Sequence, residues 1–138
     1  MNTFQSSRHF AHTPQAIFAA IQSPERLARW WGPSGFTNQF EVFDFRDGGH
    51  WVFDMVGPDG TRYANESVFA RIEADHQVVI DHTCAPLFRL TNTLEPEGNG
   101  TRVHWLQVFD DPAFAQAMKH ILEPANAQNL DRLALELG

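Results

Sequence analysis

Residues 39–60, QFEVFDFRDGGHWVFDMVGPDG, contain two segments of strand composition, each followed by a glycine-rich stretch. Gln39–Phe45 is rich in phenylalanine, and large apolar side chains occupy every second position of Trp51–Val56. A period of two is typical of a β-strand with one buried face. Arg46–Gly49 and Gly57–Gly60 favour tight turns, because glycine tolerates a positive φ angle. Strands joined by short turns are antiparallel, so this stretch predicts the start of an antiparallel sheet.

The same pattern continues toward the C-terminus. Further strand-like segments are separated by turn signals, the strongest of which is Glu97–Gly100. A meander of about six antiparallel strands is therefore expected in the middle of the chain. Thr3–Phe10 also has strand composition, and we expect it to pair with an edge of the meander. The remaining predicted strands are Tyr63–Ile72, Gln77–His82, Leu87–Leu94 and Arg102–Phe109.

Helical patterns flank the predicted strands. Thr13-Pro14 and Ser23-Pro24 each place a capping hydroxyl before a proline, which is typical of a helix start. Apolar residues recur at helical spacing in Ala113–Leu122 and again in Ala125–Leu137. Pro124 lies between these segments, so we expect it to kink one helix or to begin a new one. The order predicts an α+β domain in which a curved antiparallel sheet of six to seven strands surrounds a long C-terminal helix.

Composition narrows the class of protein. The chain has 138 residues, with 10 Lys and Arg against 17 Asp and Glu, and its formal charge is -7. This charge disfavours nucleic-acid binding, which needs clustered cations. Cys84 is the only cysteine, so an intramolecular disulfide is excluded. No apolar run approaches the roughly 20 residues of a membrane helix, so we expect no membrane insertion and a cytoplasmic location.

Several motifs together resemble one branch of the START-like (SRPBCC) superfamily, the branch named after the activator of the heat-shock protein 90 ATPase. The resemblance covers nearly the whole chain, and its motifs follow in the same order. The matching segments are Trp30-Trp31-Gly32-Pro33, Gly35-Phe36, Asp44–Trp51, Gly57–Gly60 and Gln128–Leu133.

The resemblance implies the helix-grip fold over one domain, residues 1–138. Superfamily members bind lipids, hormones or polyketides between the sheet and the long helix, and a few are cyclases, hydrolases or dehydratases. In the eukaryotic co-chaperones of this branch a separate N-terminal domain accompanies such a domain, and we expect none in this chain. The family often has Gly-Trp near the start of its last helix, where this chain has Pro124-Ala125-Asn126. We therefore expect a differently shaped cavity mouth.

The aromatic content indicates what lines such a cavity. The chain has 12 Phe and 4 Trp but only 1 Tyr, so most of its rings carry no hydroxyl group. These rings either fill the core themselves or leave room for an apolar molecule. The candidate ligand-binding residues are Trp31, Phe36, Trp51, Phe53, Met55, Phe88, Leu90, Trp105, Met118, Leu122, Asn126 and Leu130.

Candidate catalytic groups are few. His82 and His104 lie on predicted strands among apolar residues, where an imidazole serves as a general base only if it faces a cavity. Glu66 and Arg89 are the charged candidates for orienting a ligand, together with the amide of Asn126. Most polar strand residues are expected to point to solvent; they are Asn65, Glu66, Asp81, Arg89, Asn92, Arg102 and Gln107. No zinc-ligand spacing, phosphate loop or nucleophile elbow is present, so we expect no metal and no cofactor.

Three functions remain after this reading. The first is binding of a small hydrophobic or aromatic molecule between sheet and helix. The second is an enzyme of the cyclase, hydrolase or dehydratase type in the same cavity, with His82 or His104 as acid–base. The third is a protein-interaction module. Adjacent helical positions lie about 100° apart, so Trp30 and Trp31 are expected not to be buried together; Trp30 would then dock a chaperone or a second copy of the chain.

Overall fold

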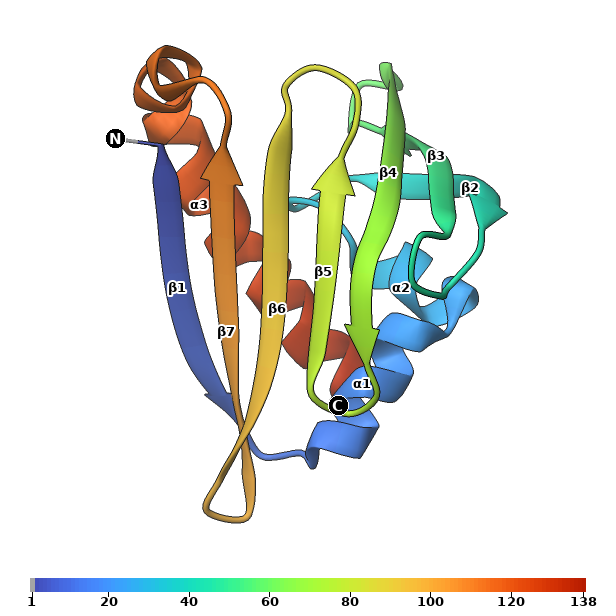
Figure 1. Ribbon diagram of the computed structural model, residues 1–138, viewed down its shortest axis with the longest axis vertical. Helices are drawn as coiled ribbons and strands as arrows, with labels where there is room; N and C mark the ends of the chain where they lie inside the picture. The colour runs from blue at the N-terminus through green and yellow to red at the C-terminus, as the bar shows by residue number, and fades with distance from the viewer. Residues whose placement is uncertain (1) are drawn as a thin grey trace.

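The computed structural model describes residues 2–138, and these residues form the predicted α+β fold (Figure 1). The strand predicted over Gln39–Phe45 begins and ends two residues earlier in the structure than in the prediction. Most of the other strands are longer than predicted by one or a few residues. In chain order the elements are β1 (Thr3–Phe10), α1 (Pro14–Gln22), α2 (Pro24–Trp30), β2 (Thr37–Phe43), β3 (His50–Val56), β4 (Arg62–Glu73), β5 (Gln77–His82), β6 (Phe88–Glu97), β7 (Gly100–Phe109) and α3 (Pro112–Leu137).

The strands form one antiparallel, 7-stranded sheet in the order β1-β7-β6-β5-β4-β3-β2. Strands β2 to β7 follow one another as a meander, as the turn signals predict. Strand β1 pairs with β7 along its whole length, from Thr3 opposite Val108 to Phe10 opposite Thr101. The expected pairing of Thr3–Phe10 with an edge of the meander is therefore confirmed, and Figure 1 shows β1 beside β7.

The sheet is curved, and two irregularities in register contribute to the curvature. The register shifts between Phe40 and Val42 on β2 and between Phe69 and Arg71 on β4. Such bulges bend a strand and increase its local twist. The turn before β3 depends on Gly49, where an added Cβ would collide with the carbonyl oxygen of Asp44. Only glycine fits this close approach of backbone to backbone.

Each helix begins at the capping residue that precedes a proline. The Thr13 hydroxyl accepts a hydrogen bond from the Ala16 amide at 3.1 Å. The Ser23 hydroxyl accepts one from the Arg26 amide at 3.3 Å. These bonds satisfy amides that have no partner inside the helix, and the proline at the first position has no amide hydrogen to lose. The predicted starts of α1 and α2 are confirmed.

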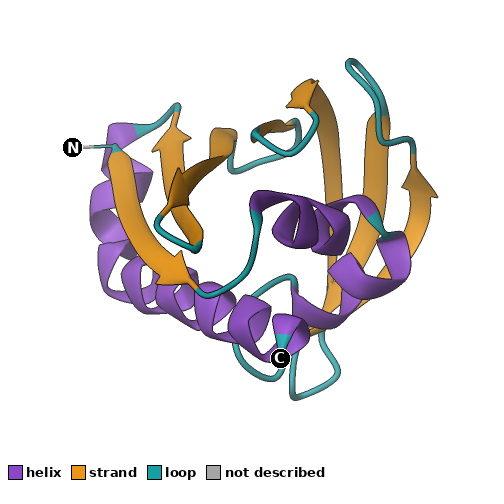
Figure 2. Ribbon diagram, turned by 90° about the horizontal axis from the view of Figure 1, so that it is seen from below, coloured by secondary structure: helices purple, strands orange, loops and turns teal. Residues whose placement is uncertain are grey.

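Of the two outcomes expected at Pro124, a kink in one helix or the start of a new helix, the structure excludes the second. Pro124 lies inside α3, and Pro112–Leu137 is a single helix rather than two. Proline removes the bond to the carbonyl of His120, four residues earlier, but packing on both sides of this point holds the helix together. The helix crosses one face of the sheet and follows a curved path (Figures 1 and 2). Within residues 2–138, neither α3 nor another helix is long and apolar enough to cross a bilayer.

The core lies between the concave face of the sheet and the three helices. Its largest fully buried side chains come from all of these elements, which explains why the sheet closes on the helices. Burial of each large apolar side chain stabilises the fold by about 1.5–3 kcal/mol. They include Ile17, Leu27, Trp30, Trp51, Phe69, Leu90, Leu94, Val103, Leu130 and Leu133.

Candidate functional site

A cavity of about 320 Å³ lies between the concave face of the sheet and α3. Its walls come from the loop after α2, strands β3 to β7, the segment before β6 and the middle of α3. Ile121 lines the cavity and is 49% exposed, so the cavity opens to solvent beside this residue. The residues lining it are Trp31, Gly32, Pro33, Phe36, Trp51, Phe53, Met55, Asn65, Ser67, Ile80, His82, Pro86, Phe88, Leu90, Trp105, Gln107, Ile121, Leu122, Ala125, Asn126 and Asn129.

Trp31 forms the inner wall on the helical side. Its ring centroid lies 5.1 Å from that of Trp51 and 5.6 Å from that of Trp105. Aromatic pairs at these separations are favourable. Trp31 therefore connects the loop after α2 to strands β3 and β7.

Trp30 is not part of a docking surface. It is 1% exposed, and its indole nitrogen donates a hydrogen bond to the carbonyl of Ala20 at 3.0 Å. The expectation that Trp30 is the exposed ring of this pair is wrong, because Trp30 is buried and the half-buried Trp31 lines the cavity. Trp31 is in an extended conformation (φ -71, ψ 134), so the helical angle of about 100° between neighbours does not apply to this pair. Contact with a chaperone or with a second copy of the chain stays a prediction, but an exposed Trp30 no longer supports it.

The loop of residues 31–36 is bound to α3 by three side chains. Gln128 accepts a hydrogen bond from the Ser34 amide at 3.2 Å. Asn129 accepts a hydrogen bond from the Gly32 amide at 3.1 Å and donates one to the Trp30 carbonyl at 2.9 Å. Arg132 donates to five backbone carbonyls at 2.7 to 3.1 Å, those of Arg29, Trp31, Gly32, Pro33 and Phe36. Burial lowers the pKa of the Arg132 guanidinium, and the carbonyl oxygens replace the water it has lost. This wall of the cavity is therefore fixed to the helix.

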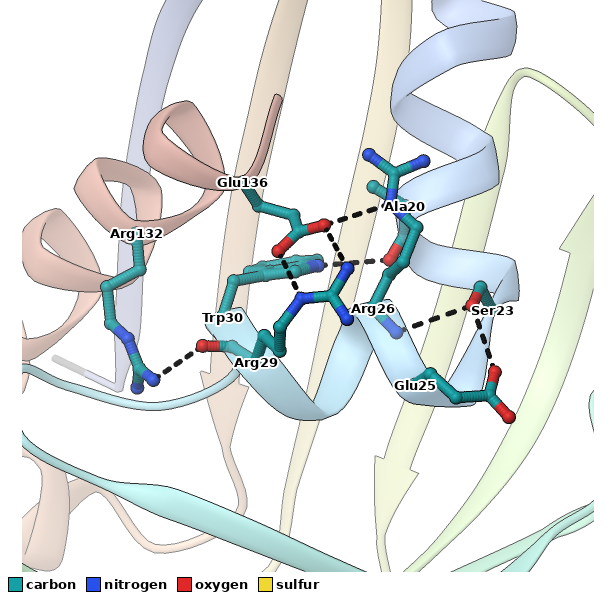
Figure 3. Close-up of polar contacts among 8 residues, drawn as sticks. All are labelled: Ala20, Ser23, Glu25, Arg26, Arg29, Trp30, Arg132 and Glu136. Carbon is teal, nitrogen blue, oxygen red and sulfur yellow. Dashed lines mark hydrogen bonds and ion pairs between the residues drawn. The ribbon is translucent and has the colours of Figure 1, made fainter. Parts of the chain in front are cut away.

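The contacts of Asn129 and Arg132 form a first clamp, between α3 and the loop. A second clamp, formed by Glu136, joins α2 to the end of α3. Glu136 accepts hydrogen bonds from Arg29 at 2.9 and 2.8 Å and from Arg26 at 3.0 Å (Figure 3). Hydrogen bonding by Arg29, reinforced by Arg26, lowers the pKa of Glu136 from 4.5 to about 2. The clamp holds α2 against α3, directly before the loop that carries Trp31.

On the sheet side of the cavity, the imidazole of His82 is held by short polar contacts. Its Nδ1 lies 2.6 Å from the Pro86 carbonyl oxygen and its Nε2 lies 2.9 Å from Oδ1 of Asn65. The Cys84 sulfur is 3.5 Å from the same Nε2, and the imidazole stacks on Phe88 with centroids 4.5 Å apart. His82 is 8% exposed. Its ring is held in place on both edges and one face.

Besides His82 and its partner Asn65, the polar side chains of Ser67 and Gln107 face the cavity from the sheet. Ser67 is 3% exposed and lies opposite His82 in the register of β4 and β5. Gln107, on β7, is 7% exposed, and its oxygen accepts a hydrogen bond from the Asn126 amide at 3.1 Å. The expectation that most polar strand residues point to solvent is wrong for Gln107 and for Asn65, which lines the cavity and contacts His82. It is also wrong for Asn92, which is 2% exposed and has no hydrogen-bond partner for either amide atom among residues 2–138.

The structure brings most of the predicted ligand-binding residues together. Every one of them lines the cavity except Met118 and Leu130. Met118 lies one helical turn before Leu122, and Leu130 is 1% exposed in the core. Whether the lining residues bind a molecule stays a prediction.

Of the candidate catalytic residues, His82 alone lines the cavity. Glu66 is exposed on β4. Arg89 pairs with Asp81 at 2.7 Å, and His104 lies 3.5 Å from Glu95 on the outer side of the sheet. Strand alternation explains this result, because each of these side chains directly precedes a buried residue (Ser67, Leu90 or Trp105) and points to the opposite face.

Sequence reasoning missed several wall residues. Ser67 and Ile80 share a strand face with Asn65 and His82, so the period of two was a usable signal for them. Pro86 and Asn129 gave no signal, since their positions depend on a loop and on the rotation of α3. No group of three His, Cys, Asp or Glu side chains suited to a metal ion occurs within residues 2–138.

Comparison with known proteins places the chain. The family model described as Activator of Hsp90 ATPase homolog 1-like protein matches residues 11–138. The chain belongs to this family. This match confirms the branch of the superfamily that was predicted from the motifs in Trp30–Phe36 and Asp44–Gly60. No curated protein matches the sequence.

Solved structures show the same family fold. A protein from Nitrosomonas europaea is 18% identical, with a TM-score of 0.90 over 99% of this chain and 94% of that one. A protein from Arthrobacter aurescens is 26% identical, with a TM-score of 0.90 over 98% and 85%. An AHSA1-like protein from Aeromonas hydrophila is 20% identical, with a TM-score of 0.75 over 98% and 91%. These similarities establish the helix-grip architecture for this family member.

Proposed function

We propose that this family member binds a small apolar molecule in the cavity between the sheet and α3. The observation that carries the proposal is the cavity itself, about 320 Å³ with walls made mainly of aromatic and aliphatic side chains. Cavities of about 300–1,000 Å³ with a few polar groups are typical of small-molecule sites. A chain that needed its rings only for stability would pack them without a space of this size.

Catalysis is the weaker alternative for the same cavity. His82 is its only titratable lining residue, and both ring nitrogens contact oxygen atoms of Pro86 and Asn65. A general base needs a nitrogen within reach of the substrate proton. The geometry therefore supports binding better than acid–base chemistry.

The test compares two tryptophan substitutions on the same helix. Ala125 lines the cavity, so Ala125→Trp fills it with an indole ring. Ala127 is exposed, so Ala127→Trp adds the same ring outside the cavity. The probe is N-phenyl-1-naphthylamine, a neutral apolar dye whose emission rises in apolar surroundings.

We expect saturable dye binding to the wild-type protein and to Ala127→Trp, and its loss in Ala125→Trp. Circular dichroism verifies that both variants are folded. Equal binding by the two variants, or no saturable binding by the wild-type protein, would refute the proposal.

A further inference from the structure

His82 is the only titratable side chain in the walls of the cavity. None of its lining residues is Asp, Glu, Lys or Arg, although these types make up 20% of the chain. Arg132 lies nearby but directs its guanidinium at the backbone carbonyls of the loop after α2. Both ring nitrogens of His82 already contact oxygen atoms of Pro86 and Asn65, so an ionised group buried in this cavity would lack a partner, at a cost of several kcal/mol. A carboxylate or phosphate is therefore a poor occupant.

The side chains of Ser67 and Gln107 nevertheless have unused hydrogen-bonding capacity, as do the indole nitrogens of Trp51 and Trp105, which are buried without a partner among residues 2–138. No hydrogen bond between the described residues involves the hydroxyl of Ser67, which is 3% exposed. Gln107, 7% exposed, uses only its oxygen, in the bond from Asn126. Whichever way these two amides are turned, the pair keeps one free amide group and one free oxygen. A ligand that fills the cavity without pairing these groups would leave them buried and unpartnered, at a cost of about 1–3 kcal/mol each, so they favour a ligand with polar groups of its own.

The polar groups lie at opposite sides of the cavity. Ser67 is on β4, beside His82, and Gln107 is on β7 opposite Leu90 of β6. Three strand intervals separate β4 from β7, which corresponds to about 14 Å along the sheet. Ile80 and Leu90 form the apolar floor between them.

Building on the proposed function, we infer that the ligand is a neutral, elongated, mainly apolar molecule with a hydroxyl or carbonyl group at each end. One end is hydrogen-bonded by Ser67 and the other by the Gln107–Asn126 pair. Trp51, Trp105 and Phe88 contact the rings or chain between the two ends. Ser67 and Gln107 are then the residues that determine specificity.

Three probes of one shape test this inference: biphenyl, its para,para′-dihydroxy derivative and its para,para′-dicarboxylate. Each is titrated against the protein–dye complex, and the dissociation constant is obtained from the displacement of N-phenyl-1-naphthylamine. A neutral hydrogen bond contributes about 0.5–1.5 kcal/mol. We therefore expect the dihydroxy compound to bind at least roughly fivefold more tightly than biphenyl, and the dicarboxylate at least roughly tenfold more weakly than the dihydroxy compound.

The variants Ser67→Ala and Gln107→Leu assign each end. Each is expected to weaken binding of the dihydroxy compound by roughly two- to tenfold while leaving biphenyl unchanged. Thr91→Val is the matched control, because Thr91 alternates with Leu90 and Asn92 and lies on the outer face of β6. It removes a hydroxyl without touching the cavity.

The outcomes separate this inference from the proposed function. If biphenyl displaces the dye and the hydroxyl groups add nothing, the cavity binds apolar molecules but the inferred ligand class is wrong. Equal affinity for the dicarboxylate, or a hydroxyl advantage that survives both Ser67→Ala and Gln107→Leu, also overturns the inference. Absence of dye binding by the wild-type protein overturns both.

Discussion

Replacement of Glu136 by glutamine tests the clamp between α2 and α3. The pKa of Glu136 is about 2 in the folded protein against 4.5 for the free side chain. A shift of this size corresponds to about 3 kcal/mol at neutral pH. Arg26 and Arg29 are 32% and 59% exposed, and solvent screening reduces the contribution. We expect Glu136→Gln to lower the free energy of unfolding by about 1–2 kcal/mol at pH 7.

The loss depends on pH in a defined direction. Because folding lowers the pKa of Glu136, its contribution is complete above the unfolded value of 4.5 and disappears as pH falls toward about 2. Urea unfolding between pH 7 and pH 3 measures it, with intrinsic fluorescence of the tryptophans as the signal. The difference between wild type and Glu136→Gln should shrink over the acid part of this range.

Glu123→Gln is the matched control on the same helix. Its partner Lys119 is 3.8 Å away and the carboxylate is 57% exposed, so we expect a change below about 0.5 kcal/mol. A loss for Glu136→Gln as small as that of the control would refute the reasoning. A loss that stays constant from pH 7 to pH 3 would show that it does not arise from the carboxylate charge.

Two more substitutions test buried polar groups. Asn92→Leu removes an amide that has no partner among residues 2–138, so we expect the unfolding free energy to rise by about 1–3 kcal/mol; a decrease in thermal stability would contradict this. Arg132→Lys leaves several loop carbonyls without a donor, because a compact ammonium group does not reach all five. We expect a loss of about 1–3 kcal/mol and faster hydrogen exchange at the Gly32 amide; unchanged exchange would argue against the clamp.

Local patterns were sufficient to predict the fold. Alternation in Trp51–Val56 and the glycine-rich turns on both sides of it identified the sheet, and capping residues at Thr13 and Ser23 located the first two helices. Pro124 left two outcomes open, and no new helix begins there because proline removes one helix bond, whereas the packing of α3 against the sheet involves many contacts. The sequence shows the first effect and not the second.

The site was predictable only in part, for two physical reasons. Strand periodicity shows which residues share a face of the sheet, but it does not show which face the helices cover. Gln107 and Asn92 are polar, and they were therefore assigned to the solvent-facing side. Backbone direction at a helix end is also invisible in the sequence. The change from helix to extended backbone at Trp31 leaves Trp30 in the core and Trp31 half-buried in the cavity wall.

The clamps described above have a consequence for the order of events during synthesis. Asn129, Arg132 and Glu136 all belong to α3, the last element along the chain, while their partners lie about 100 residues earlier. A nascent chain that has finished its strands still lacks the wall that encloses the binding space. Contacts so distant in sequence form slowly, so the protein gains a closed interior only after its C-terminal helix has left the ribosome.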